Sequence, residues 1–348
     1  MNTLDKSSNK IDYKGEGFKT KNLFNVIYVE EAAFKYPITK EVLDKYCNLQ
    51  VITIRHYKDV FNRTNQHFQI QKQYQSLILA VKDKPFLYEG PQVCQNFGYP
   101  NFYYTSFLLN CIFDCGYCYL QGMYNSANIV AFVNVEDFKN SIEQESLKKP
   151  VFLAVSYDTD LIGFYNIIPY IDYFYGFFKM HPALTVEIRT KSGNQSFYKT
   201  HTALDNIVIA FTLSPQEIIE KYEKNTPPLK TRIKAIKTAL DQGFKVRICL
   251  DPVFINPVAD HLYEPFYEYV FSEINANKIL DLSFGFFRMS KEFFKRIKKQ
   301  SEYSDLFLDE YCLNENVISY PKEYQNNIMT RHYQILTNYM KKEKIFSL

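Results

Sequence analysis

Between residues 100 and 290, short apolar runs alternate with longer amphipathic stretches. Six of the runs have the length and the β-branched or aromatic content of buried strands. The predicted strands are Tyr104–Leu109, Val151–Ser156, Leu184–Arg189, Ile207–Leu213, Lys245–Leu250 and Ile279–Phe286. The predicted helices are Glu136–Lys148, Gly163–Met180, Pro215–Lys224, Leu229–Gln242 and His261–Ala276. In the clearest helix, Ile233, Ile236 and Leu240 share one face, and Gly243 provides a stop signal.

Strands that alternate with helices predict a parallel sheet and therefore an α/β fold. Six such units predict a partial (β/α)6 barrel of the TIM-like type, which we assign to residues 101–290. Functional residues in such barrels lie at the C-terminal ends of the strands. The segments that follow the predicted strands are therefore the first place to look for chemistry.

The chain on either side of this barrel has a less regular pattern. Residues 23–100 predict an N-terminal α/β region, with a helix at Ile38–Cys47 and strands at Val51–His56 and Ser76–Val81. Residues 291–348 predict a C-terminal helical region whose Lys and Arg side chains form a solvated face. Residues 1–22 are polar with mixed charges and predict a flexible tail. They do not resemble a signal peptide, which requires an apolar segment.

Composition and charge restrict the class of protein. The 348 residues suffice for one large or two ordinary domains, and a hydrophobic content of 46% predicts a globular protein. A net charge of +3 permits nucleic-acid binding without indicating it. The most apolar stretch, residues 161–180, contains Asn166, Pro169 and Asp172, so it predicts a buried helix rather than a membrane span. We therefore expect a cytoplasmic protein with no membrane partner.

Three of the seven cysteines, Cys111, Cys115 and Cys118, follow the pattern C-x3-C-x2-C. At this spacing, three thiolates can each bind one iron of a four-iron, four-sulfur (4Fe-4S) cluster. The fourth iron then remains available for a small molecule. Radical SAM enzymes use this arrangement to cleave S-adenosylmethionine (SAM) reductively, and Tyr117 fits the aromatic residue that they usually place before the third cysteine.

Two other interpretations of the three cysteines remain open, zinc binding and unpaired thiols in the core. Zinc normally requires a fourth Cys or His ligand at motif distance. The nearest later histidine is His181, and Cys94 lies well upstream. A disulfide framework does not suit a long chain with an odd number of cysteines.

The segment Cys115-Gly-Tyr-Cys-Tyr-Leu-Gln121 resembles a segment of the spore photoproduct lyase family of radical SAM enzymes. Residues 132–138 and 27–37 resemble two further segments of that family, and the resemblance extends from about residue 25 to residue 340. It implies a radical SAM barrel with a 4Fe-4S cluster and SAM as cofactors. It also implies UV-damaged DNA as a partner and an external electron donor such as flavodoxin or ferredoxin.

The resemblance also implies roles for residues that follow the predicted strands. Asp160 matches a residue near the SAM ribose or amino group, Lys191 a lysine that pairs with the SAM carboxylate, and Ser214 a serine able to bind SAM polar groups. Strand-end loops also carry such residue types for capping, which is the alternative reading. Tyr117 and Tyr119 match tyrosines that the family is thought to use in relaying the radical, although both could equally pack around the cluster.

Two departures from the family pattern concern the substrate. The family's hydrogen-atom donor is a cysteine, and the aligned position here is Tyr157. A tyrosine O–H could return the hydrogen atom, as could a cysteine from elsewhere, such as Cys249, which otherwise reads as a core thiol. The stretch Asp309–Arg331 looks shorter than the family's lesion-probing β-hairpin and lacks its run of basic and glycine residues.

The sequence therefore supports three hypotheses of function. The first is a radical SAM enzyme that resembles spore photoproduct lyase and repairs a thymine-dimer photolesion in DNA. The second keeps the radical chemistry and changes the substrate to another nucleic acid, a nucleotide or a protein side chain. The third is a metal-binding protein without enzymatic activity.

Overall fold

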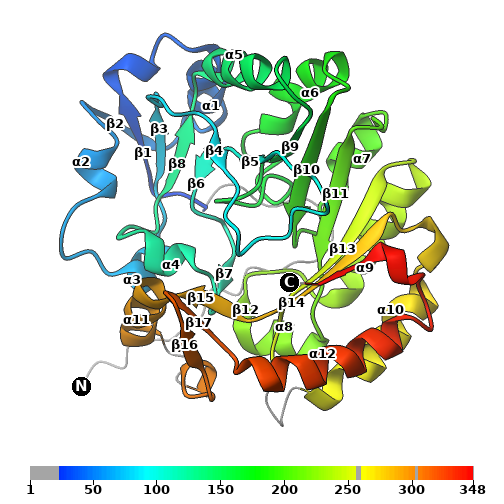
Figure 1. Ribbon diagram of the computed structural model, residues 1–348. Coiled ribbons are helices and arrows are strands. Elements are labelled where there is room, and N and C mark those ends of the chain that lie inside the picture. Colours follow the sequence, from blue (N-terminus) through cyan, green and yellow to red (C-terminus); the bar gives the residue numbers. More distant parts are fainter. Residues whose placement is uncertain (1–22, 256–259, 302–304, 348) are drawn as a thin grey trace.

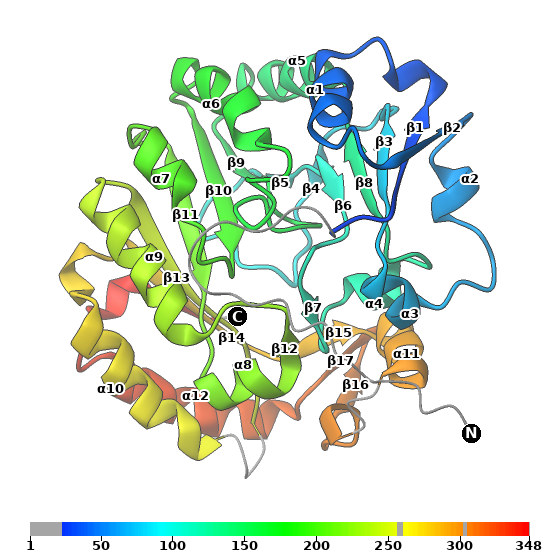
Figure 2. The same ribbon diagram turned by 180° about the vertical axis from the view of Figure 1, so that it is seen from behind.

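The computed structural model describes residues 23–255, 260–301 and 305–347. The predicted tail at residues 1–22 lies outside the described residues. Two sheets stand side by side, and helices surround the outer face of the larger one (Figures 1 and 2). In the described parts of the chain, no helix combines the length and the apolar character that a membrane crossing requires.

The larger sheet has eight strands within the described residues. Across the sheet they are β18 (Ile345–Ser347), β14 (Asp281–Phe286), β13 (Lys245–Val253), β11 (Ile207–Thr212), β10 (Leu184–Thr190), β9 (Val151–Ala154), β5 (Phe102–Tyr104) and β4 (Tyr88–Glu89). Neighbouring strands from β18 to β5 are parallel, whereas β4 and β5 are antiparallel. Every residue of β11 and β14 is buried, as expected for parallel strands that are covered on both faces.

Helices lie between successive strands of this sheet and form its outer layer (Figure 1). They are α5 (Val135–Ser146), α6 (Tyr170–Met180), α7 (Ser196–Thr200), α8 (Gln216–Tyr222), α9 (Leu229–Asp241) and α10 (Tyr263–Glu273). Because β9, β10, β11, β13 and β14 alternate with these helices, the α/β partial-barrel prediction is confirmed. The helix predicted at Gly163–Met180 begins only at Tyr170, since Pro169 lacks an N–H and disfavours helical backbone before it.

The smaller sheet contains the N-terminal strands and part of the chain predicted to be barrel. Its order is β2 (Gln50–Ile54), β1 (Val26–Glu30), β3 (Leu77–Ala80), β8 (Ile129–Phe132) and β6 (Leu108–Leu109). The helices α1 (Pro37–Lys45), α2 (Lys58–Phe61) and α3 (Phe68–Gln73) belong to the same part of the chain. The predicted strand Tyr104–Leu109 is in fact two strands, because the chain leaves the larger sheet after β5 and joins the smaller one at β6.

The C-terminal region is not wholly helical as predicted. It contains α11 (Lys291–Gln300) and α12 (Lys322–Leu336), but also a small sheet of β15 (Arg288–Ser290), β17 (Val317–Ser319) and β16 (Cys312–Asn314). A hairpin, β16–β17, is thus present in the stretch that looked shorter than the family's lesion-probing hairpin. Strands of three residues are too short to show an alternating pattern, and the turn at Glu315 has a positive φ of 54° without a glycine to mark it.

The segment between β4 and β5, which we call the closing loop (residues 90–101), reaches from the β4 edge of the larger sheet to contact β18 at the opposite edge. The ring of Phe97 lies 5.4 Å from that of Phe346 on β18, and Gln95 Nε2 donates a hydrogen bond of 3.1 Å to the Ser347 carbonyl. Phe97 also covers the guanidinium of Arg247 on β13 at 3.1 Å. The closing loop therefore spans the side on which the curled sheet is open.

Candidate active site

The three motif cysteines lie on a loop that leaves the smaller sheet directly after β6. Asn110 turns the chain there with a φ of +68°, a left-handed conformation that asparagine tolerates better than most residues. Its side-chain amide donates hydrogen bonds to the carbonyls of Ser126 at 2.7 Å and Asn128 at 2.8 Å. A polar residue at this position therefore sets the direction in which the cysteine loop departs.

Several elements hold the cysteine loop in place. The short strand β7 (Asp114–Cys115) pairs with β12 (Glu223–Lys224), which replaces the last turn of the helix predicted at Pro215–Lys224. Gln121 donates to the Cys115 carbonyl at 2.7 Å, and the ammonium of Lys72 donates to the Cys111 carbonyl. The loop is therefore built by residues from distant parts of the chain.

The three motif thiols lie in a buried environment that disfavours their charged form. Burial raises the pKa of Cys111 to about 12, that of Cys115 well above its ordinary value, and that of Cys118 as well, although Lys191 or Lys72 acts in the opposite direction at each. The Phe113 N–H points to Cys111 Sγ at 3.4 Å. Thiolates in this position require nearby positive charge, which iron supplies.

A cluster and a single ion place different demands on the three thiols. Within the described residues, no group of three His, Cys, Asp or Glu side chains could hold a metal ion between them. Each thiolate of a 4Fe-4S site binds a different iron, so the three sulfurs need not converge. A 4Fe-4S site therefore does not require the three sulfurs to meet at one point.

Lys191 follows β10 and brings a cation to the cysteine loop. Its ammonium lies over the ring of Tyr117, 5.4 Å from the centroid. Burial would lower the pKa of Lys191, but the charges of Cys115 and Glu223 outweigh it and raise the pKa. The structure gives this ammonium no hydrogen-bond acceptor among the described residues, so it is available to an anionic ligand.

A buried acid that the sequence analysis did not single out organises the opposite side of the loop. Glu223 accepts hydrogen bonds from the Tyr117 hydroxyl and from Ser214 Oγ at 3.3 Å, and it pairs with the fully buried Arg232. Burial would raise the pKa of Glu223, but Arg232 and Lys191 lower it overall. Tyr117 and Ser214 are thus held by one carboxylate, which in the sequence looked like an ordinary residue of a helix end.

Asp160, predicted to contact SAM, has both carboxylate oxygens occupied by protein donors. Oδ1 accepts from the Gly163 N–H and the Thr190 hydroxyl, and Oδ2 accepts from the Lys191 N–H, each at 2.7 Å. Burial raises its pKa while these donors oppose the shift. The carboxylate therefore fixes the backbone at Lys191, on the neighbouring strand end.

Tyr119 and Tyr157 form a second group of predicted residues. The Tyr119 hydroxyl donates to the Tyr157 carbonyl at 2.6 Å, and the two ring centroids lie 5.9 Å apart. Tyr157 also stacks on Tyr104 with centroids 4.1 Å apart. Burial raises the pKa of both predicted tyrosines, so both hold their hydroxyl protons.

The sulfur of Cys94, on the closing loop, lies 3.7 Å from the Tyr157 hydroxyl. This contact joins residues 63 positions apart, so no local pattern could indicate it. Arg288 holds the adjacent backbone, since its Nε donates to the Val93 carbonyl at 2.8 Å and its guanidinium pairs with Asp251 at 3.0 Å. Cys249, the other candidate thiol, is fully buried within β13.

The structure thus brings the predicted residues together as two adjoining groups. The first surrounds the cysteine loop and consists of Cys111, Cys115, Cys118, Tyr117, Lys191 and Ser214. The second consists of Tyr119 and Tyr157, with Cys94 added by the structure. Asp160 lies with the first group through the Lys191 backbone.

Comparison with known proteins gives consistent results. A curated spore photoproduct lyase from Bacillus subtilis (strain 168) is 22% identical over 303 residues, which cover 82% of this chain and 84% of that protein. A solved mutant of spore photoproduct lyase superimposes with a TM-score of 0.79 at 15% identity and covers 93% of this chain and 98% of its own. Another mutant, solved with bound AdoMet and dinucleoside spore photoproduct, gives a TM-score of 0.77 at 16% identity and the same coverage.

At such identities the structural matches establish the fold, and the family follows from the sequence model. The model of the family described as spore photoproduct lyase matches residues 23–344, which is nearly the whole described chain. The resemblance noted in the cysteine segment is therefore confirmed over both sheets. This chain belongs to the spore photoproduct lyase family.

Proposed function

We propose that this protein is a radical SAM enzyme that repairs spore photoproduct, a thymine-dimer lesion in DNA. The observation that carries the proposal is the juxtaposition of the cysteine loop with the unpaired ammonium of Lys191, in a chain of this family. A relative solved with both AdoMet and a dinucleoside spore photoproduct supports the assignment of cofactor and substrate.

The first group of residues would hold the cofactors. Cys111, Cys115 and Cys118 would bind the 4Fe-4S cluster, which when bound supplies the electron for reductive cleavage of SAM. Lys191 would pair with the SAM carboxylate. Asp160 would orient Lys191 rather than touch SAM, because its oxygens are already used within the protein.

Ser214 and the three tyrosines have two different roles in this proposal, to shape the site and to take part in the reaction. Ser214 and Tyr117 share the Glu223 carboxylate, so we assign them to shaping the cluster side of the site. Tyr119 and Tyr157 would face the substrate side. Both tyrosines keep their protons at neutral pH, as a hydrogen-atom relay requires.

DNA and an electron donor would be the macromolecular partners. The last turn of α11 carries Lys298 and Lys299, and α11 lies beside the β16–β17 hairpin, which together offer a surface for a phosphate backbone (Figure 1). A damaged base costs less to extrude from the stack, which favours its entry into a barrel mouth. An external donor such as flavodoxin or ferredoxin would reduce the cluster, in the cytoplasm.

The test is 5′-deoxyadenosine formation by anaerobically reconstituted protein with dithionite, SAM and a spore-photoproduct dinucleotide, with thymine release followed in the same samples. We expect both products from the wild-type protein and neither from Cys115→Ala, which removes one iron ligand. Cys47→Ala is the matched control, because Cys47 is exposed and outside the motif. Full activity of Cys115→Ala would contradict the proposal.

One observation favours the second candidate, a different substrate for the same radical chemistry. The hairpin turn carries Glu315, an acidic residue where a phosphate backbone would favour a basic one. Deoxyadenosine formation without thymine release, together with equal binding of UV-irradiated and undamaged DNA, would select this candidate.

A further inference from the structure

Since Tyr157 occupies the position of the family's donor cysteine, a hydrogen atom must reach the substrate radical from another group or from the tyrosine itself. The only cysteine sulfur that the described residues bring into hydrogen-bond contact with Tyr157 is that of Cys94, at 3.7 Å. We propose that Cys94 is the hydrogen-atom donor of this enzyme and that the donor thiol has moved from the end of β9 to the closing loop. This inference rests on the proposed function.

Cys94 is held in a defined position rather than on a loose segment. Its N–H donates to the Pro91 carbonyl at 2.9 Å, and Arg288 fixes the preceding residue through the Val93 carbonyl at 2.8 Å. Further along the closing loop, Phe97 packs between Phe152 and Phe346. A hydrogen-atom transfer requires reacting atoms held close together, and these contacts provide that constraint.

The surroundings of Tyr157 indicate that a polar ligand belongs there. On the same segment, the hydroxyls of Ser156 and Thr159 are buried and have no hydrogen-bond partner among the described residues. Arg189, at the end of β10, also has an unpartnered Nε, and its charge acts on Cys94. Buried polar atoms are nearly always bonded in the working state, so a substrate with polar edges would satisfy them.

The proposed step balances in atoms and electrons. The S–H bond of Cys94 breaks homolytically, a C–H bond forms on the methylene radical of the released thymine, and a thiyl radical remains on sulfur. One electron from the flavodoxin-type or ferredoxin-type donor and one proton from water then restore the thiol. Each turnover therefore consumes one SAM and releases one 5′-deoxyadenosine.

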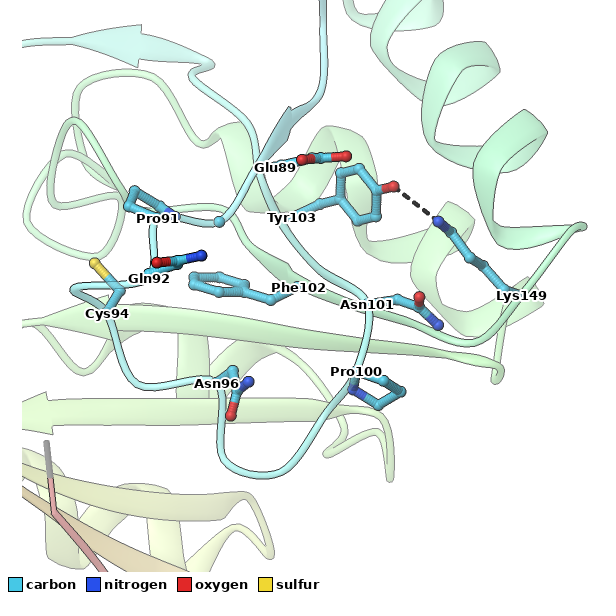
Figure 3. Close-up of a pocket in the computed structure, with 11 residues that line it drawn as sticks. Glu89, Pro91, Gln92, Cys94, Asn96, Pro100, Asn101, Phe102, Tyr103 and Lys149 are labelled. Carbon is cyan, nitrogen blue, oxygen red and sulfur yellow. Dashed lines mark hydrogen bonds between the residues drawn. The ribbon is translucent and has the colours of Figure 1, made fainter.

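Solvent has a route to this thiol. Cys94 lines a surface pocket of about 430 Å³ together with Gln92, Asn96 and Phe102 (Figure 3). Figure 3 shows the Cys94 sulfur pointing away from the Phe102 ring. Because Cys94 is only partly buried and borders this pocket, its S–H can exchange with water before the hydrogen atom is transferred.

The experiment measures deuterium in thymine released in D2O, because S–H exchanges with solvent and the C–H of 5′-deoxyadenosine does not. We expect one deuterium in the thymine methyl group of the wild type. In Cys94→Ala we expect SAM cleavage to continue while release of deuterated thymine falls about tenfold or more. Cys47→Ala, at an exposed cysteine outside the site, should match the wild type.

The outcomes separate this inference from the function on which it rests. Deuterated thymine at the wild-type rate from Cys94→Ala overturns the donor assignment and leaves the repair function standing. SAM cleavage by the wild type without any thymine release overturns the repair function, and the donor assignment with it.

Thiol alkylation of the protein without cofactors gives an independent readout. Burial raises the pKa of Cys94, while the Tyr157 hydroxyl and Arg288 act in the opposite direction, so losing the hydrogen bond should lower the thiolate fraction further. Tyr157→Phe should slow alkylation of Cys94, followed by peptide mass spectrometry, and leave the exposed Cys47 unchanged. Equal rates at Cys94 in the two proteins would show that the contact does not exist in solution and would overturn the inference.

Discussion

At the scale of single residues, the site depends on a few buried charges near the cysteine loop. Lys191 and Arg232 are the cations, and Glu223 lies between them as the shared anion. Lys191 differs from Arg232 because it has no acceptor of its own within the described residues, whereas Arg232 is paired with Glu223. Among the residues that the structure describes around the cysteine loop, Lys191 is therefore the cation that a ligand carboxylate could pair with.

Replacing Lys191 tests this assignment. Lys191→Met should weaken SAM binding about 10- to 100-fold, since a hydrogen bond to a charged group contributes about 1.5–3 kcal/mol. Lys191→Arg keeps the charge and should recover part of the affinity. SAM affinity by equilibrium binding and iron content by colorimetry are the measurements, and unchanged affinity at full iron content in Lys191→Met would contradict the assignment.

The three motif cysteines could be singled out from the sequence because their spacing is local. Lys191 and Ser214 could be proposed because each follows a strand and matches a family position, and the structure confirms that both lie near the cysteine loop. Cys94 and Glu223 could not be predicted. Their importance comes from contacts with Tyr157 and Arg232 that only the folded chain creates.

At the scale of helices and strands, α4 (Leu120–Met123) and α11 pack with their backbones in close approach. A Cβ placed on Gly122 would lie 2.6 Å from the Phe293 Cα, and Arg296 donates to the Gly122 carbonyl at 3.2 Å. Because α4 directly follows the cysteine loop, this contact attaches the C-terminal region to the active site. The central strands could be predicted from their apolar runs, whereas the short strands β7, β12 and β16 have no pattern long enough to detect.

Gly122→Ala should reveal how closely these two helices must approach. We expect a loss of about 1–3 kcal/mol in the free energy of unfolding, because backbone rather than a flexible side chain has to move. Gly176→Ala is the matched control. Gly176 lies inside α6 with open space around it, so alanine there should stabilise by about 0.5–1 kcal/mol. Urea unfolding measures both, and equal effects would refute the close approach.

The packing of α12 on α10 predicts a dependence of stability on pH. His332 hydrogen-bonds Tyr267 at 2.6 Å, and burial lowers its pKa although Asp260 opposes the shift. As pH falls below about 6.5, the unfolded chain binds a proton that the folded chain does not, so stability falls until the folded-state pKa is reached. Urea unfolding at several pH values should show this pH dependence of the unfolding free energy in the wild type and lose it in His332→Gln. The dependence should persist in His67→Gln, because His67 is exposed.

At the scale of the whole molecule, successive segments of the chain alternate between the two sheets. β8 belongs to the smaller sheet although it follows the cysteine loop, and β4 belongs to the larger sheet although it precedes the predicted barrel boundary at residue 101. The partial barrel itself could be predicted from the alternation of strands and helices. The assignment of each strand to a sheet could not, because an apolar run does not specify its neighbours.

The closing loop should contribute to global stability through Phe97. Phe97→Ala removes the ring that contacts Arg247, Phe152 and Phe346, and truncation of a buried Phe typically costs about 3–5 kcal/mol. Phe34→Ala is the control, since Phe34 is 45% exposed. Unfolding in urea gives the cost, and hydrogen exchange should accelerate across residues 90–101. A loop that exchanges at the wild-type rate in Phe97→Ala would show that Phe97 does not hold it.

The route of the closing loop also determines when the active site is completed during protein synthesis. Chains begin to fold while they are still being made, from the N-terminal side onward. The loop is translated before the cysteine motif, but Phe346 and Ser347, its partners on β18, are among the last described residues to be added. The loop that carries the thiol assigned to the final chemical step therefore completes its contacts with the sheet only after nearly the whole described chain has been translated.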